Sequence, residues 1–343
     1  MLYAGAGHAG RGENGAEGIT DQMSKVHIIM YHYVRDLKNS RYPGIKGLDY
    51  ELFKQQIAFL KEHFTFVTME DVVEACNSEN GTLPENAVLL TFDDGYIDNF
   101  TAVFPILKEN KIQGSFFIPG KTFTENVLLD VNKIHFTLAS ADVHSLVKDI
   151  YALLDRYRRD GMETEIPSNE ELFEKYAAAS RFDNKETIFV KRILQTAIPE
   201  KIRNQISSEL FQKYVGLPED VFARELYMNR DQIRCMKREG MFIGLHGYDH
   251  YWLGNLAEQE MKADIDKALE VMDEFVDGDN WVLNYPYGSY NPQVLQYIAS
   301  RGCKAGMVTK VAVADTDVHG RFELPRLDCN DFPPKSSNYL NIQ

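Results

Sequence analysis

Two adjacent acidic residues, Asp93 and Asp94, stand directly after an apolar run at 87–92. Gly95 follows them and permits a tight turn. Two neighbouring carboxylates at the end of a buried strand are costly unless a cation lies beside them. A metal ion on one carboxylate would reduce that cost and leave the other free to act as a base. A solvated Asp-Asp-Gly turn without chemistry is the alternative interpretation.

A pair of histidines, His246 and His250, lies at the end of a second apolar run at 241–246. This spacing lets both imidazoles bind one metal if the turn between them is tight, and Gly247 favours such a turn. The Glu of the zincin motif H-E-x-x-H is missing, and the preceding residues indicate a strand rather than a helix, so a zincin is disfavoured. One carboxylate and two imidazoles would leave coordination positions for water and substrate, as catalytic zinc sites require. A lone histidine here would instead be a satisfied core residue.

The elements that must hold these residues are short apolar runs that alternate with helical patterns. Runs rich in β-branched and aromatic residues indicate strands buried on both faces, as in a parallel sheet. About eight such strands predict an α/β fold, a distorted parallel β/α barrel of the TIM type, in which all strand carboxyl ends surround one cavity. The runs lie at 26–32, 65–68, 87–92, 114–119, 241–246, 281–286, 305–309 and 322–327.

One region, residues 125–230, breaks this alternation. It is charged, shows helical spacing of its apolar positions and contains no clear strand. We interpret it as a helical insertion on one barrel loop, where insertions often shape substrate pockets. A peripheral solvated bundle without a chemical role is the alternative.

Four segments together resemble the polysaccharide deacetylase family, also called the NodB-homology or carbohydrate esterase 4 family. They are TFDDG at 91–95, HGYDH at 246–250, YPYGSYN at 285–291 and the opening MYHYV at 30–34. The similarity covers most of 26–120 and 230–330. The resemblance implies a β/α barrel that hydrolyses N-acetyl groups on amino sugars with a divalent metal, for which Zn²⁺ is the expected ion. It implies Asp93 as general base and the backbone N–H of Tyr287 in the oxyanion hole, with three metal ligands: Asp94, His246 and His250.

The chain also departs from the family pattern at two points. Asn284 stands where many members have the Arg that orients the base, and the late Leu-x-His motif that supplies the acid is not evident. By analogy with biofilm poly-N-acetylglucosamine deacetylases, we expect Arg326 to orient Asp93 and His32 to be the general acid. A structural salt bridge for Arg326 and a core position for His32 are the alternatives. His319 is a second candidate for the acid, and no role is predicted for the histidines at 27, 63, 135 and 144.

Composition limits the possible partners and location. The chain has 343 residues and a formal net charge of −14, which disfavours nucleic acid or an anionic membrane surface, because both need a basic face. No run approaches the roughly 18 apolar residues of a membrane span. Residues 1–22 have no apolar run, so we expect a disordered N-terminal extension without an export signal, followed by a deacetylase-like domain at 23–343. Four scattered cysteines, none in a C-x-x-C pair, fit a cytoplasmic protein.

The predicted substrate is an N-acetylated sugar, with a cytoplasmic precursor of a surface polysaccharide as the preferred form. Two other classes of function remain open at this stage. One is a metal-dependent hydrolase of another non-peptide C–N bond, in a cyclic imide or an amide. The other is a catalytically silent carbohydrate-binding protein, which the missing Arg and late His motifs make conceivable. The sequence makes no prediction of the oligomeric state.

Overall fold

The computed structural model describes residues 24–78, 81–160, 166–180 and 183–342. The N-terminal extension predicted at 1–22 lies outside these residues. Within the described ranges, no helix combines the length and apolar character needed to cross a bilayer. All four cysteines have free thiols.

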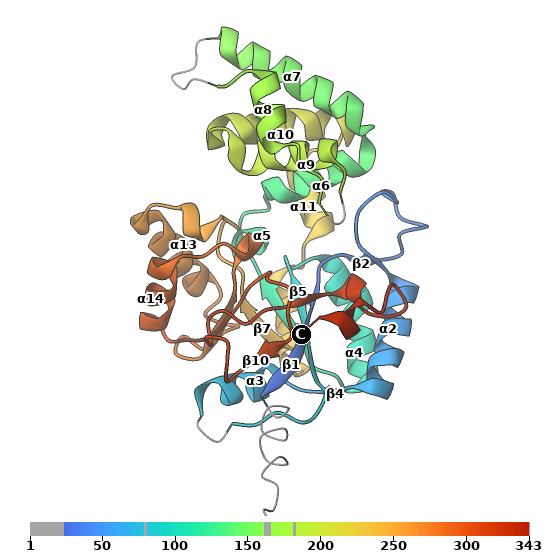
Figure 1. Ribbon diagram of the computed structural model, residues 1–343, viewed down its shortest axis with the longest axis vertical. Helices are drawn as coiled ribbons and strands as arrows, with labels where there is room; N and C mark the ends of the chain where they lie inside the picture. Colours follow the sequence, from blue (N-terminus) through green and yellow to red (C-terminus); the bar gives the residue numbers. More distant parts are fainter. Residues whose placement is uncertain (1–23, 79–80, 161–165, 181–182, 343) are drawn as a thin grey trace, which may run out of the picture.

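A nine-stranded sheet forms the centre of the fold (Figure 1). Its main path runs β10-β1-β5-β6-β7-β8-β9, and each neighbouring pair is parallel except β10 and β1. Off this path, β4 pairs with β5 and β11 pairs with β1. The strands are β1 (Lys25–Tyr31), β4 (Thr65–Phe66), β5 (Ala87–Asp93), β6 (Gly114–Ile118), β7 (Phe242–Leu245), β8 (Trp281–Asn284), β9 (Cys303–Met307), β10 (Ala314–Asp315) and β11 (Leu327–Asp328). A separate two-stranded sheet joins β2 (Val34–Arg35) and β3 (Leu48–Asp49).

The sheet curls into a half-barrel, and no continuous ladder of its described strands forms the closed ring expected of a TIM barrel. The eighth predicted strand, at 322–327, yields only the two-residue β11 beside β1 and a single bridge from Leu324 to Met307 of β9. Pro325 lies between these two contacts and has no N–H to donate, so a regular strand cannot run through this segment. The gap between β9 and β1 is therefore crossed by an irregular segment, and this segment carries Arg326.

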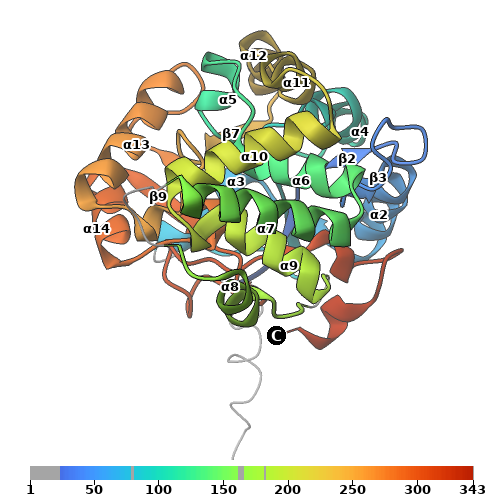
Figure 2. The same ribbon diagram turned by 90° about the horizontal axis from the view of Figure 1, so that it is seen from above.

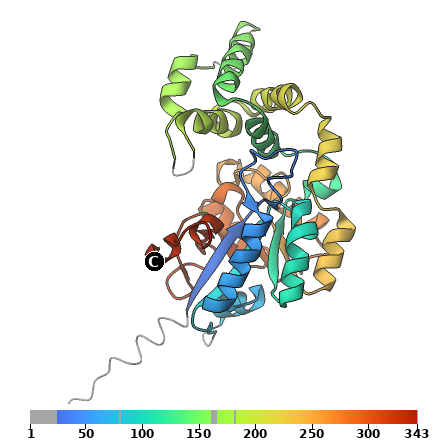
Figure 3. The same cartoon turned by 90° about the vertical axis from the view of Figure 1, so that its right-hand side faces the viewer.

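Helices cover the outside of the curled sheet (Figures 1 and 3). Every residue of β5 and β6 is buried, which is why these strands read as continuous apolar runs. In α2, Phe53, Ile57 and Leu60 recur at helical spacing and form its buried face, while Asp49 caps its first turn. The covering helices are α2 (Tyr50–His63), α3 (Met69–Asn77), α4 (Phe104–Asn110), α12 (Arg230–Arg238), α13 (Glu258–Val271) and α14 (Pro292–Ser300).

The chain between β6 and α12 consists of helices and connecting segments and contains no sheet strand among its described residues. Figure 1 shows most of these helices as a separate layer above the sheet, and the view from above shows α6, α7 and α10 crossing over it (Figure 2). A second apolar core holds this layer together, and it includes Ile134, Ile150 and Phe189. The helices are α5 (Lys121–Thr124), α6 (Asp130–Ser140), α7 (Val143–Arg159), α8 (Asn169–Tyr176), α9 (Lys185–Arg192), α10 (Glu200–Tyr214) and α11 (Glu219–Leu226).

Gln56 of α2 forms hydrogen bonds with the C-terminal segment that follows β11. Its side chain is fully buried and accepts a hydrogen bond from the Tyr31 hydroxyl at 2.5 Å. Its amide group donates to the carbonyl oxygens of Cys329 at 2.9 Å and Pro333 at 3.1 Å. One side chain therefore joins β1, α2 and the end of the chain, just beyond the segment that carries Arg326.

Replacement of Gln56 by Leu is expected to lower the free energy of unfolding by about 1–3 kcal/mol, because buried partners of the amide lose their hydrogen bonds. Urea denaturation followed by circular dichroism measures the change. Gln55→Leu is the matched control, since Gln55 is the exposed neighbour on the same helix. Equal stability of the two variants would contradict the anchoring role of Gln56.

Candidate active site

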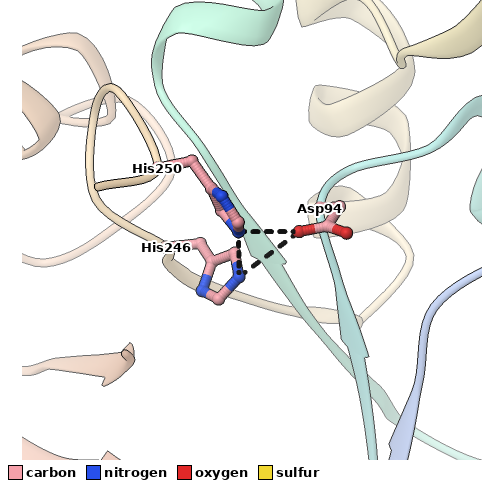
Figure 4. A group of neighbouring side chains, drawn as sticks. All are labelled: Asp94, His246 and His250. Atoms are coloured by element: carbon pink, nitrogen blue, oxygen red, sulfur yellow. Dashed lines mark hydrogen bonds and ion pairs between the residues drawn. The ribbon is translucent and has the colours of Figure 1, made fainter. Parts of the chain in front are cut away.

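The predicted metal ligands come together where β5 and β7 end (Figure 4). Asp94 directly follows β5, and His246 directly follows β7. Asp94 and His250 both have left-handed backbones, with φ of 73° and 58°. This conformation is uncommon outside glycine, and it turns the chain sharply after each of the two strands. The three side chains are 7% exposed or less.

The three ligand atoms form a nearly equilateral triangle. Asp94 Oδ1 lies 3.3 Å from His246 Nε2 and 3.2 Å from His250 Nε2, and the two nitrogens are 3.2 Å apart. Zinc bonds of about 2.0–2.1 Å at tetrahedral angles separate neighbouring ligand atoms by about 3.3–3.4 Å. Asp94 Oδ1 is buried and has no hydrogen-bond partner among the described residues. A divalent cation would satisfy this oxygen, so the residues fit a zinc-like ion.

Neighbouring groups fix the orientation of two of these ligands. His246 Nδ1 lies 2.8 Å from the Asn284 carbonyl oxygen, which only accepts, so Nδ1 carries the proton and Nε2 keeps its lone pair for a metal. The Tyr96 hydroxyl donates to Asp94 Oδ2 at 2.6 Å. Burial raises the pKa of Asp94, but contacts with His246 and His250 outweigh it and hold the pKa well below its ordinary value. Asp94 is therefore an ionised ligand.

Asp93, the last residue of β5, is held by a buried arginine. Arg326 Nη1 donates to Asp93 Oδ1 at 3.0 Å, and Nη2 lies 2.8 Å from Oδ2. Asn284 adds a third contact, from Nδ2 to Asp93 Oδ1 at 2.7 Å. Asn284, which the sequence presents only as a departure from the family pattern, thus also contacts the predicted base. Burial raises the pKa of Asp93, but the nearby charges, of which Arg326 is the strongest, and the hydrogen bond from Arg326 together outweigh it. The net pKa is lowered, so Asp93 is ionised.

The two candidates for the general acid lie in different places. His32 lines the same cavity as Asp93, with its Nε2 3.9 Å from Asp93 Oδ2 and its side chain 42% exposed. His319 lies elsewhere, in the turn after β10, where its Nδ1 accepts a hydrogen bond from the Asp315 N–H. The alternative interpretation of His32 as a core residue does not fit its exposure.

Tyr287 follows β8 in a left-handed conformation, with φ of 59°. Its ring stacks on Trp252 at 4.4 Å between centroids and meets His250 edge-on at 4.7 Å. These contacts hold the Tyr287 ring beside His250, one of the predicted metal ligands. The resemblance assigns the backbone N–H of Tyr287 to the oxyanion hole.

The insertion supplies one wall of the site, which agrees with the first of its two interpretations from the sequence. Two cavities, of about 320 and 330 Å³, both have Trp252 and Tyr287 in their walls. The cavity that contains Asp93 and Asp94 is also lined by insertion residues, which include Val131, His135, Lys191 and Gln195. The insertion therefore lies against the reaction centre and is no remote bundle.

His135, for which no role is predicted, lies in the wall of this cavity. Its Nδ1 is 3.3 Å from the Tyr33 hydroxyl. Burial lowers its pKa to about 3, so its imidazole is neutral. In sequence, His135 sits between the apolar residues Ile134 and Phe136 of a helical pattern, and no local signal marks it as part of a site.

Comparison with known proteins identifies the family. The family model for polysaccharide deacetylases matches residues 80–208 and 182–306, more than half of the chain. The chain belongs to the polysaccharide deacetylase family. YxkH of Bacillus subtilis, named as a polysaccharide deacetylase, is 18% identical over 308 residues, which cover 90% of this chain and 72% of YxkH.

Two further relatives of this deacetylase differ in how much they share with it. The poly-β-1,6-N-acetyl-D-glucosamine N-deacetylase of Escherichia coli is 37% identical over 82 residues, which cover 23% of this chain and 12% of that protein. The structure of the Streptococcus pyogenes deacetylase PplD in complex with acetate superimposes with a TM-score of 0.54 at 18% identity, over 93% of this chain and 97% of PplD. At that identity, the superposition shows a shared fold.

Arg326→Gln is expected to move the acidic limb of the pH profile of deacetylation upward by about 1–3 pH units. Arg326 lowers the pKa of Asp93 against the effect of burial, so its removal raises that pKa, and the base becomes protonated at a higher pH. The measurement is kcat/KM against pH for wild type and variant. Arg321→Gln is the control, because Arg321 is exposed and donates to Asn77 instead. An unmoved limb would show that Arg326 does not set the ionisation of Asp93.

Proposed function

We propose that this protein is a metal-dependent hydrolase that removes the N-acetyl group from an amino sugar and releases acetate. One observation carries the proposal: three buried ligand atoms within 3.3 Å of one another stand beside a carboxylate clamped by an arginine. This arrangement combines a site for a Lewis acid with a separate base. Amide hydrolysis needs both, because water must be activated and the carbonyl polarised.

Asp93 is the proposed general base. It is ionised, and contacts with Arg326 and Asn284 fix the position of its carboxylate. The positive charge of Arg326 also stabilises the ionised form. Asp94, His246 and His250 would hold the cation, which would lower the pKa of water and polarise the acetyl carbonyl. Asp93 takes the proton of the attacking water. The backbone N–H of Tyr287 donates to the oxyanion that develops on the carbonyl oxygen, a role for which one donor typically contributes about 2.7–4 kcal/mol.

His32 is the proposed general acid for the leaving amine. It lines the cavity on the side of Asp93, and its partly exposed side chain has room to approach a substrate. Among the described residues of that wall, His135 is the other histidine besides the proposed ligands His246 and His250. Its pKa of about 3, lowered by burial, leaves it without a proton to give near neutral pH. We therefore assign the proton transfer to His32.

The proposed substrate is a short saccharide or saccharide conjugate that carries an N-acetyl group. Two observations support this class. The reaction cavity lies between the strand ends and the insertion, and a second cavity of similar volume shares Trp252 and Tyr287 with it. The E. coli relative that shares 82 residues is named for an N-acetyl-D-glucosamine polymer. We also propose a cytoplasmic location, because all four cysteines are free thiols. For that location, the proposed substrate is a precursor of a surface polysaccharide.

Asp93→Asn is expected to abolish turnover while the protein keeps its metal, because the amide cannot take a proton and the three ligands are intact. The measurement combines metal analysis of the purified protein with an amine-release assay over N-acetylated sugars. Asp94→Asn is the matched variant and is expected to lose metal and activity together. A chelator should inactivate the wild type, and added Zn²⁺ should restore it.

Three results would overturn the proposal. Full activity of Asp93→Asn would remove the base from the mechanism. Hydrolysis of a cyclic imide without amine release from any N-acetylated sugar would assign the site to a different C–N bond. Tight sugar binding with bound metal and no turnover would indicate a carbohydrate-binding protein instead.

A further inference from the structure

The helical insertion reaches the metal ligand Asp94 through a chain of buried hydrogen bonds. Asn132 of α6 donates from Nδ2 to the Tyr96 hydroxyl at 2.7 Å, and Tyr96 donates to Asp94 Oδ2 at 2.6 Å. A second hydrogen bond joins Asn132 Nδ2 to the Tyr33 hydroxyl at 2.8 Å. On the other side, Asn132 Oδ1 accepts from the hydroxyl of Tyr227, the residue after α11. Helices of the insertion are thus joined to Asp94 through Tyr96.

The direction of each hydrogen bond in this chain is determined at both ends. At one end, the Leu129 N–H can only donate, and it donates to the Tyr227 hydroxyl at 3.2 Å. The Tyr227 proton is then free to point at Asn132 Oδ1, which turns the amide nitrogen toward Tyr96. At the other end, the Asp94 carboxylate can only accept, so Tyr96 must donate to it and accept from Asn132. Both ends require the same orientation of the Asn132 amide.

Burial makes this chain rigid. Asn132 and Tyr96 are fully buried, and Tyr227 is 3% exposed, so water does not compete for their polar groups. The Tyr96 ring stacks on Tyr33 at 4.0 Å between centroids with an interplanar angle of 16°. The backbone of the turn is held as well, since the Met228 N–H donates to the Gly95 carbonyl at 3.0 Å. The turn that carries Asp94 is therefore fixed from the insertion side.

We propose that Asn132 is a positioning residue for the metal site: through Tyr96 it keeps Asp94 Oδ2 occupied and leaves Oδ1 as the single ligating oxygen. Oδ1 is the atom that faces His246 and His250 and lacks a hydrogen-bond partner in the described part of the chain. The inference rests on the proposed metal site. It gives the insertion a function besides lining the cavity, because the Asn132 amide donates to Tyr96 and so directs the Tyr96 proton to Asp94.

Asn132→Asp tests the proposal with almost no change of shape. The new carboxylate accepts from the three surrounding tyrosine hydroxyls, which stabilise its ionised form, and it diverts the Tyr96 proton from Asp94. Zinc affinity, measured by competition with a chromophoric chelator, should fall about 10–100-fold, as for other partners of metal ligands. The visible spectrum of the Co²⁺-loaded protein should change as well, since it reports ligand geometry. A purely structural role for Asn132 would leave that spectrum unchanged.

Tyr96→Phe provides the second arm, because it removes the donor to Asp94 at small cost to packing. It should weaken zinc binding by a similar factor, and Asn132→Asp should add little in the Tyr96→Phe background. Thr137→Val is the control, since Thr137 is buried on the same helix and its hydroxyl has no partner in the described residues. Its zinc affinity and cobalt spectrum should match the wild type.

The outcomes separate the two proposals. A wild type that binds no zinc through Asp94 would refute the proposed function. A zinc-binding wild type with unchanged affinity in Asn132→Asp would refute the positioning role alone. The positioning role would also be refuted if Asn132→Asp weakened zinc binding equally in the wild type and in the Tyr96→Phe background. If Asn132→Asp does not fold, an unchanged affinity in Tyr96→Phe is the refuting result.

Discussion

The burial of two adjacent carboxylates is the constraint on which the rest of the site depends. Asp93 and Asp94 are 1% and 3% exposed, so neither charge is stabilised by bulk water. Each therefore needs its own positive partner. Arg326 neutralises Asp93 with two contacts, whereas Asp94 presents a bare oxygen to two imidazole nitrogens. Because the two charges are balanced in different ways, one carboxylate can serve as a base and the other as a ligand.

The parallel sheet brings these partners together from distant parts of the chain. Asp94 follows β5 and His246 follows β7, and β6 lies between these strands. Strands two places apart are separated by about 10 Å, which is too far for direct contact between straight strand ends. The backbones of Asp94 and His250 are left-handed and turn the chain after each of the two strands, and the three ligand atoms come within 3.3 Å of one another.

The sequence predicts the parts of this site that have local signals. Apolar runs mark β1, β5 and β6, and the Asp-Asp-Gly and His-x-x-x-His patterns mark their chemistry. Arg326 was expected only by analogy, and its contact with Asp93 depends on the irregular segment that crosses from β9 to β1. The open barrel was missed because the effect of Pro325 on pairing depends on strand register. Asn132 was missed because a single Asn in a helical pattern carries no sign of a partner 36 residues away.

Helix α6 of the insertion holds Asn132 and His135 in fixed positions relative to each other. Asn132 and His135 are three residues apart in α6 and thus lie on one face of the helix. Both contact the Tyr33 hydroxyl, at 2.8 Å and 3.3 Å. The same face therefore reaches Asp94 through Tyr96 and presents a neutral imidazole to the cavity. A flexible loop would pay conformational entropy to hold these two groups in register, whereas a helix anchored by its own apolar core holds them together as one rigid unit.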